Sequence, residues 1–158
     1  MNLKNPYTII STGFGSGLSP LAPGTVGSFF ASIIYYILFF ENIIVLVDFI
    51  IFFSFIIFSF LLGLYIYPKT VEGQNDPASF VWDEFVGMWV ACIPLAVMND
   101  SIFWLVISFV LFRIFDILKP IGIKKLDEKH GAFFVMIDDI LAGLLAAIIV
   151  TFLSIFFI

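Results

Sequence analysis

The stretch MIDDILAG, Met136 to Gly143, decides the fold, because the adjacent carboxylates Asp138 and Asp139 open a long uncharged run. That run extends from Ile140 to Ile158. As a helix it would cover roughly 28 Å, close to the hydrocarbon thickness of a bilayer. A charge pair at the mouth of a membrane helix is costly unless it is solvated, paired or bound to a cation. Two interpretations are therefore open: two solvated residues at a helix end, or part of a metal site.

The composition indicates an integral membrane protein with a single domain over residues 1–158. The chain is 62% hydrophobic and 12% charged, whereas soluble domains are about a quarter charged. A net charge of −5 without a basic patch excludes nucleic acid as a partner. The single cysteine, Cys92, excludes an internal disulfide, and the single histidine, His130, excludes a histidine-rich metal site. The first ten residues lack the features of a secretory signal.

About five apolar helices are expected, which predicts an all-α membrane bundle. A Gly- and Pro-rich segment, Ser11 to Ser28, precedes them and cannot be a regular helix throughout. The apolar segments are Phe29 to Phe40 with a helix start near Thr25, Ile43 to Tyr67 ended by Pro68, Phe80 to Met98 with Pro94 near its end, Ile102 to Leu118, and the run that follows Asp139. Polar loops are expected at Lys69 to Ser79, Asn99 to Ser101 and Lys119 to Lys129.

The basic residues predict the orientation of this bundle. With alternating spans all seven fall on one side, namely Lys4, Lys69, Arg113, Lys119, Lys124, Lys125 and Lys129. None falls in the opposite turns around Glu41 and Asp100. Positive residues remain cytoplasmic, so this side is expected to face the cytoplasm. The Gly-rich segment and the acidic groups of three apolar segments fall on the same side, which predicts a polar site at the cytoplasmic helix ends.

Three motifs besides the DD pair contain candidate site residues. LAPGTVGSF, Leu21 to Phe29, places glycines, Thr25 and Ser28 at a helix start, which suits either an anion or a simple capping loop. VWDEFVG, Val81 to Gly87, places Asp83 and Glu84 side by side, either bracketing a cation or favouring the positive end of a helix.

FRIFDILKP, Phe112 to Pro120, spaces Arg113, Asp116 and Lys119 at three-residue intervals on one helix face. In one interpretation Arg113 and Asp116 form an ion pair and Lys119 anchors the helix at the membrane interface. In the other, Arg113 or Lys119 contacts a phosphate while Asp116 is a metal ligand. Hard oxygen ligands suit Mg²⁺, and carboxylate-bound Mg²⁺ with cationic partners suits phosphoryl chemistry. His130 precedes the last helix and fits a cap, a surface residue or a catalyst.

The chain resembles the phosphatidylglycerophosphatase A family from about Asn5 to Ala147. The resemblance rests on four blocks in order: GFGSGLSPLAPGTVGS (Gly13 to Ser28), DPASFVWDEFVGMW (Asp76 to Trp89), FRIFDILKP and MIDDILAG. One departure is visible, because the family's glycine-rich HGG-x-G run before the DD pair is HGAFF here, with Ala132 and Phe134.

The resemblance implies Mg²⁺-dependent hydrolysis of phosphatidylglycerol phosphate to phosphatidylglycerol and phosphate at a bacterial inner membrane. The expected site residues fall into three overlapping groups. The metal ligands are Asp83, Glu84, Asp116, Asp138 and Asp139; the phosphate-binding residues are Gly24, Thr25, Ser28, Arg113 and Lys119; the catalytic residues are Asp83, Glu84, Asp139 and Lys119. The nucleophile is expected to be water or a carboxylate, and the sequence leaves open whether the chain forms a homo-oligomer.

Two other classes of protein remain as alternatives. A small ion transporter would use intramembrane acids as its ion path, and it predicts that Asp48→Asn impairs function. Against it, the acids cluster at one face instead of near mid-membrane. A non-catalytic lipid-phosphate-binding subunit would retain the same residues without turnover.

Overall fold

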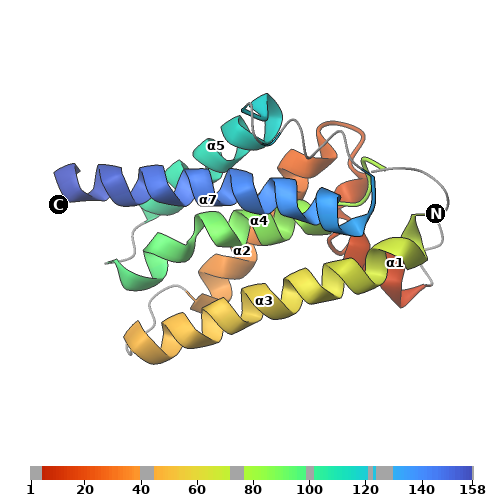
Figure 1. Ribbon diagram of the computed structural model, residues 1–158, viewed down its shortest axis with the longest axis horizontal. Coiled ribbons are helices and arrows are strands. Elements are labelled where there is room, and N and C mark those ends of the chain that lie inside the picture. Colours follow the sequence, from red (N-terminus) through yellow and green to blue (C-terminus); the bar gives the residue numbers. More distant parts are fainter. Residues whose placement is uncertain are drawn as a thin grey trace.

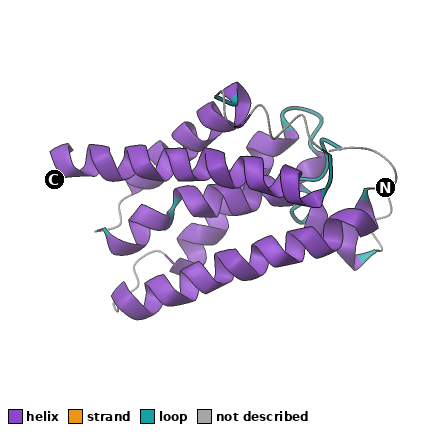
Figure 2. Cartoon of the chain, in the orientation of Figure 1, coloured by secondary structure: helices purple, strands orange, loops and turns teal. Residues whose placement is uncertain are grey.

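The computed structural model describes residues 5–39, 45–71, 77–98, 102–120, 123 and 130–157, and every regular element in these ranges is helical (Figure 2). The α-helices are α1 (Pro6–Ser11), α2 (Pro23–Phe39), α3 (Val45–Thr70), α4 (Trp82–Ala91), α5 (Ile102–Leu118) and α7 (Ala132–Phe157). Two short 3-10 helices, η1 (Ser16–Leu18) and η2 (Ile93–Val97), complete the described elements. The prediction of an all-α fold is confirmed.

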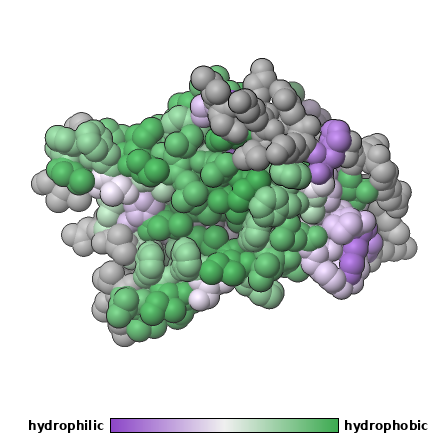
Figure 3. Space-filling view, viewed as in Figure 1, coloured by the Kyte–Doolittle hydropathy of each residue, from purple (hydrophilic) through white to green (hydrophobic). Residues whose placement is uncertain are grey.

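Successive long helices alternate in direction, so that five helix termini gather at one end of the molecule (Figure 1). This end, called the polar end below, holds the starts of α2, α4 and α7 and the ends of α3 and α5. Hydrophilic surface is concentrated there in Figure 3. The polar helix ends therefore meet, as the sequence predicted.

Two helices are long and apolar enough to cross a membrane, within Leu46–Thr70 and Ala132–Phe156. Large apolar side chains on their outer faces are exposed, among them Phe58 and Leu61 on α3 and Ile148 and Phe152 on α7. In Figure 3 such side chains form a nearly continuous surface away from the polar end. An apolar exterior of this size is expected against lipid, so the two helices indicate membrane association.

The third expected apolar segment is not one continuous helix. Phe80 to Met98 divides at Cys92 into α4, of ten residues, and η2. Pro94 causes the division, because it lacks the N–H of a continuing α-helix and its ring crowds the carbonyl one turn earlier. At 1.5 Å per residue α4 is only about 15 Å long, which is too short to cross a bilayer.

Helix α4 instead forms the core of the bundle. Every residue of α4 except Glu84 is buried, and the helix packs against α2, α3, α5 and α7. The indole of Trp82 donates to the carbonyl of Ser59 on α3 at 2.9 Å, and that of Trp89 donates to the carbonyl of Ala31 on α2 at 3.0 Å. A polar tip with a partner lets these large rings be buried without an unsatisfied N–H.

The helices α4 and α7 touch backbone to backbone at two glycines. A Cβ on Gly143 would meet the carbonyl oxygen of Gly87. A Cβ on Gly87 would lie 2.7 Å from the carbonyl oxygen of Asp139 and 2.7 Å from the ring of Phe112. Since a backbone carbonyl cannot rotate away as a side chain can, only glycine permits this approach at either position.

Helix α2 begins at Pro23, close to the expected start near Thr25, which fits the preference of proline for the first helical position. Two other predicted helix boundaries, the end of α3 and the start of α7, are wrong, and each has a local cause. Helix α3 continues through Pro68 to Thr70, whose hydroxyl donates to the carbonyl oxygens of Ile66 and Tyr67 at the helix end.

Helix α7 begins at Ala132, so Asp138 and Asp139 lie in its second turn and not at its mouth. Both are buried against protein, and that is why they do not end the helix. The expected turn at Asn99 to Ser101, the far-side Glu41, the basic residue Lys4 and most of the loop Lys119 to Lys129 lie outside the described residues.

We predict that Gly87→Ala lowers the free energy of unfolding by about 1–3 kcal/mol, the usual range for overpacking a core. The added methyl group would meet the backbone of α7 and force the two helices apart. Thermal unfolding in detergent measures the effect. Gly63→Ala is the matched control in α3, because its methyl group would meet the flexible end of Met136. Equal stability of the two variants would contradict the backbone contact.

Candidate functional site

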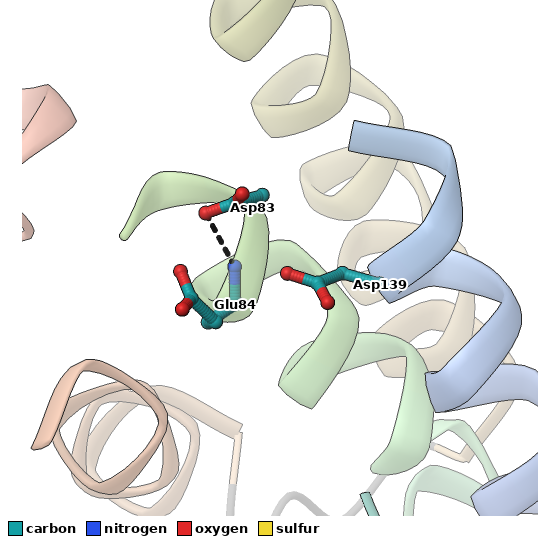
Figure 4. A group of neighbouring side chains, drawn as sticks. All are labelled: Asp83, Glu84 and Asp139. Carbon is teal, nitrogen blue, oxygen red and sulfur yellow. Dashed lines mark hydrogen bonds between the residues drawn. The ribbon is translucent and has the colours of Figure 1, made fainter. Parts of the chain in front are cut away.

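Three carboxylates from two helices converge at the polar end. Asp83 and Glu84 lie in the first turn of α4, and Asp139 points toward them from α7 (Figure 4). One ligand oxygen from each lies within 4.8 Å of the other two. Asp83 and Asp139 are buried and Glu84 is half-buried. These three residues are called the carboxylate trio below.

The spacing of residues along each helix explains why the trio converges. Asp83 lies four residues before Gly87, and Asp139 lies four residues before Gly143. Residues four apart share a helix face, so each carboxylate lies one turn from a contact glycine. Local hydrogen bonds add to the order, because the backbone N–H of Glu84 donates to Asp83 Oδ1 at 3.0 Å, a contact drawn in Figure 4.

Two basic residues form ion pairs beside the trio, one on α5 and one directly after it. Arg113 Nη1 lies 2.7 Å from Asp116 Oδ2 within α5, and Lys119 Nζ lies 2.8 Å from Asp138 Oδ2. Asp138 also accepts the backbone N–H of Asp139 at 3.1 Å. The pair of Lys119 and Asp138 thus joins the end of α5 to the site region of α7.

The start of α2 closes the site on the other side. Arg113 Nη1 donates to Ser28 Oγ at 3.2 Å, and Ser28 donates in turn to the carbonyl oxygen of Gly24 at 2.7 Å. A Cβ on Gly24 would meet Glu84 Oε1 and would lie 3.3 Å from Arg113 Nη1. Glycine therefore lets the first turn of α2 approach Glu84 and Arg113, and the N-terminal end of a helix favours an anion.

Two buried polar atoms in this region have no hydrogen-bond partner among the described residues: Glu84 Oε2 and Arg113 Nε. The pKa of Glu84 is raised to about 7, mainly because the carboxyl group is buried and in smaller part because of the charge of Asp116, while the hydrogen bond with Asp83 and the charge of Arg113 act in the opposite direction. A buried carboxylate oxygen without a donor fits a cation, and a free guanidinium N–H fits a phosphate oxygen. The trio therefore fits a divalent metal with oxygen ligands such as Mg²⁺.

The structure places the five predicted metal ligands close together, with different partners. Asp83, Glu84 and Asp139 form the trio. Asp116 pairs with Arg113 and also lies within hydrogen-bond reach of Asp139, and Asp138 pairs with Lys119. The predicted phosphate-binding residues Gly24, Ser28 and Arg113 lie together beside Glu84. Thr25 is half-buried in the first turn of α2.

His130 is exposed just before α7, and Asp48 lies in the first turn of α3, at the end opposite the site.

The sequence prediction missed the two glycines at which α4 and α7 touch, Gly87 and Gly143. The repeated spacing of an aspartate four residues before a glycine, in DEFVG and DDILAG, was the signal that could have identified them.

These features define a class of protein: a membrane-associated helical protein with a buried acidic site suited to a divalent cation and a phosphate group. The comparisons with known proteins give the family. The phosphatidylglycerophosphatase A family model matches residues 9–154, and the chain belongs to this family.

Curated relatives cover almost the whole chain. It is 43% identical over 153 residues to a phosphatidylglycerophosphatase A of Haemophilus influenzae, covering 95% of this chain and 90% of the relative. It is 36% identical over 157 residues to that of Escherichia coli, covering 98% and 87%. A protein of Bacteroides thetaiotaomicron described as a putative phosphatidylinositol-3-phosphatase is 42% identical over 146 residues, covering 90% and 89%. No solved structure matches the chain.

We predict that Lys119→Met destabilises the protein more than the double change Lys119→Met with Asp138→Asn. The single change leaves the buried Asp138 carboxylate without its ion-pair partner, which costs about 2–3 kcal/mol even though Lys119 is partly exposed. The double change removes the charge as well as its partner and should recover about 1 kcal/mol or more. Thermal unfolding of wild type, both single variants and the double variant measures the coupling. Additive effects of the two changes would contradict the pairing.

Proposed function

We propose that this protein hydrolyses phosphatidylglycerol phosphate to phosphatidylglycerol and inorganic phosphate with Mg²⁺ as its cofactor. The observation that carries the proposal is the trio beside Arg113 and the start of α2. Family membership and two relatives described as phosphatidylglycerophosphatase A support the same substrate.

Asp83, Glu84 and Asp139 would hold the metal ion. Their donor set is all oxygen, and Glu84 Oε2 is buried without a hydrogen-bond partner among the described residues. When bound, Mg²⁺ supplies Lewis-acid stabilisation of the charge on the phosphoryl group. Asp116 and Asp138 contribute to the metal site indirectly, because they hold Arg113 and Lys119 in place.

The phosphate group is bound by the side of the site opposite α7. Arg113 offers its free Nε–H, and the first turn of α2 at Gly24 and Thr25 offers backbone N–H groups. Ser28 orients Arg113 through its hydrogen bond. Lys119 adds positive charge at the end of α5, where it stabilises the oxygen that leaves with the lipid.

The reaction consumes one water molecule. The water oxygen bonds to phosphorus, the bond from phosphorus to the glycerol oxygen breaks, and that oxygen takes up a proton. A carboxylate of the trio takes the proton that the water loses. The products are the lipid alcohol and inorganic phosphate.

The protein is proposed to be a multi-pass protein of the bacterial inner membrane with its site facing the cytoplasm. Lys69, Arg113 and Lys119 lie at the polar end, and positive residues mark the cytoplasmic side. In this orientation the substrate reaches the trio from the cytoplasmic leaflet.

A phosphoinositide is the second candidate substrate. The specific observation in its favour is the Bacteroides thetaiotaomicron relative, which is 42% identical and is described as a putative phosphatidylinositol-3-phosphatase. Both candidates are phosphate monoesters on a lipid, so the same residues would serve either one.

We predict that the purified protein in detergent micelles releases phosphate from phosphatidylglycerol phosphate only when Mg²⁺ is present. Asp139→Asn removes one of three metal-binding carboxylates and should lower kcat by about 100-fold or more. Asp48→Asn, at the opposite end of α3, is the control and should retain full activity. Phosphatidylinositol 3-phosphate is assayed in parallel to rank the two substrates.

Three outcomes would count against this assignment. If folded wild type releases no phosphate with any divalent cation, the protein is not this enzyme, and the alternative of a non-catalytic lipid-binding subunit is favoured. Full activity of Asp139→Asn would retain the function but remove the trio from the site. Loss of function in Asp48→Asn with an intact fold would favour the ion transporter.

A further inference from the structure

An apolar groove lies between the outer faces of α2 and α5. It has a volume of about 360 Å³, and its walls include Phe29, Ile33 and Tyr36 from α2 and Leu105, Val106 and Phe109 from α5. These residues repeat at three- and four-residue spacing, so each helix contributes one continuous face. From Phe29 to Tyr36 the groove follows α2 for roughly 10 Å.

The groove is apolar along its length and accessible from the membrane side. Ile33 and Val106 are 38% and 52% exposed, whereas Leu105 is buried at its floor. The hydroxyl of Ser32, which also lines the groove, donates to the carbonyl of Ser28 at 2.9 Å. The hydroxyl of Ser32 is thus already satisfied by the backbone, and the apolar side chains of the groove offer dispersion contacts to a hydrocarbon.

One end of the groove reaches the phosphate side of the candidate site. Phe29 directly follows Ser28, and Phe109 lies one turn before Arg113. The rings of Phe29 and Phe109 meet across the two helices with centroids 6.4 Å apart. Immediately beyond them Arg113 binds Ser28, so the two helices that form the groove also supply the phosphate-binding residues.

We infer that the groove between α2 and α5 binds an acyl chain of the lipid substrate while its phosphate lies at Arg113 and the start of α2, an inference that rests on the proposed function. A lipid phosphate monoester has an anionic head and apolar chains joined by a few bonds. The apolar groove matches the acyl chains, and the positively charged Arg113 at its end matches the phosphate. A lipid moving sideways from the bilayer could thus place its phosphate beside the trio without its chains leaving an apolar environment.

Charge distinguishes this groove from a second apolar hollow of similar volume. That hollow lies between η2 and α7 and is lined by residues such as Pro94, Leu144 and Ile148. The charged residues of α7 are the two carboxylates Asp138 and Asp139, so α7 brings no cation to this hollow. Of these two hollows, the groove between α2 and α5 is the one that leads to a cation, Arg113, and to the start of a helix.

Filling the groove tests this inference by kinetics. Ile33→Trp replaces an aliphatic side chain with a bulky indole ring that fills the groove. It should raise KM for dipalmitoyl phosphatidylglycerol phosphate by about tenfold with kcat retained, because the lost contact binds the substrate equally in the ground state and the transition state. Hydrolysis of the deacylated headgroup, which has no chain to bind, should change less than about twofold. Ile57→Trp, on the exposed outer face of α3, is the matched control and should change neither substrate. Unchanged KM for the dipalmitoyl substrate in Ile33→Trp would overturn the groove assignment while leaving the proposed function intact.

Photolabelling tests the same inference without turnover. The protein is placed in phosphatidylcholine vesicles that contain a trace of one of two probes. The first probe is phosphatidic acid whose acyl chain bears a diazirine, and the second is phosphatidylcholine with the same diazirine-bearing chain. We expect the phosphatidic acid probe to label peptides of α2 and α5 in preference to α3, and unlabelled phosphatidylglycerol phosphate to compete. The phosphatidylcholine probe should label without this preference. Equal labelling by both probes would mean that the groove holds bulk lipid, and it would overturn the inference even if the protein proved not to be a phosphatase.

Discussion

The backbone contact between Gly87 of α4 and Gly143 of α7 is the constraint on which the rest of the structure depends. It brings two helices to a separation that no side chain permits. Because Asp83 and Asp139 lie one turn before these glycines, the same contact brings their carboxylates together. The short α4 can occupy the centre of the bundle because long α3 and α7 and the flanking α2 and α5 surround it.

Two ion pairs lie beside this contact among the described residues, Arg113 with Asp116 and Lys119 with Asp138. The trio lies next to them, with one ligand oxygen of each residue within 4.8 Å of the other two. Burying three carboxylates close together is costly unless a cation compensates them. The hydrogen bond from Arg113 to Ser28 also keeps the guanidinium group beside the start of α2.

The sequence predicted the helices well where apolar runs were uninterrupted. Ile102 to Leu118 is helix α5 with the bounds expected, because polar residues flank it on both sides. Prediction failed at Phe80 to Met98 and at the start of α7. In the first case apolar composition hid the break before Pro94. In the second, the charges indicate a helix boundary, but burial against protein and the ion pair of Asp138 with Lys119 let Asp138 and Asp139 lie within the helix.

The candidate site residues were predictable as a set but not in their arrangement. Acidic and basic residues at the ends of apolar runs, and a Gly-rich helix start, indicated which side chains would gather. The pair of Arg113 and Asp116 was open to prediction from its three-residue spacing, but composition could not show that Lys119 would pair with Asp138 or that Glu84 would face Gly24. Such distinctions depend on contacts between residues far apart in sequence, which local periodicity does not encode.

The central claim is that helix contact positions the metal ligands, and the affinity for Mn²⁺ tests it most directly. Mn²⁺ prefers the same oxygen ligands as Mg²⁺, and electron paramagnetic resonance reports the free ion. Gly143→Ala deletes no ligand, yet its methyl group would meet the Gly87 carbonyl and separate the helices. We predict that folded Gly143→Ala binds Mn²⁺ about tenfold more weakly than wild type, as loss of support around a metal site does, while Gly63→Ala binds as wild type. Unchanged affinity in folded Gly143→Ala would contradict the account.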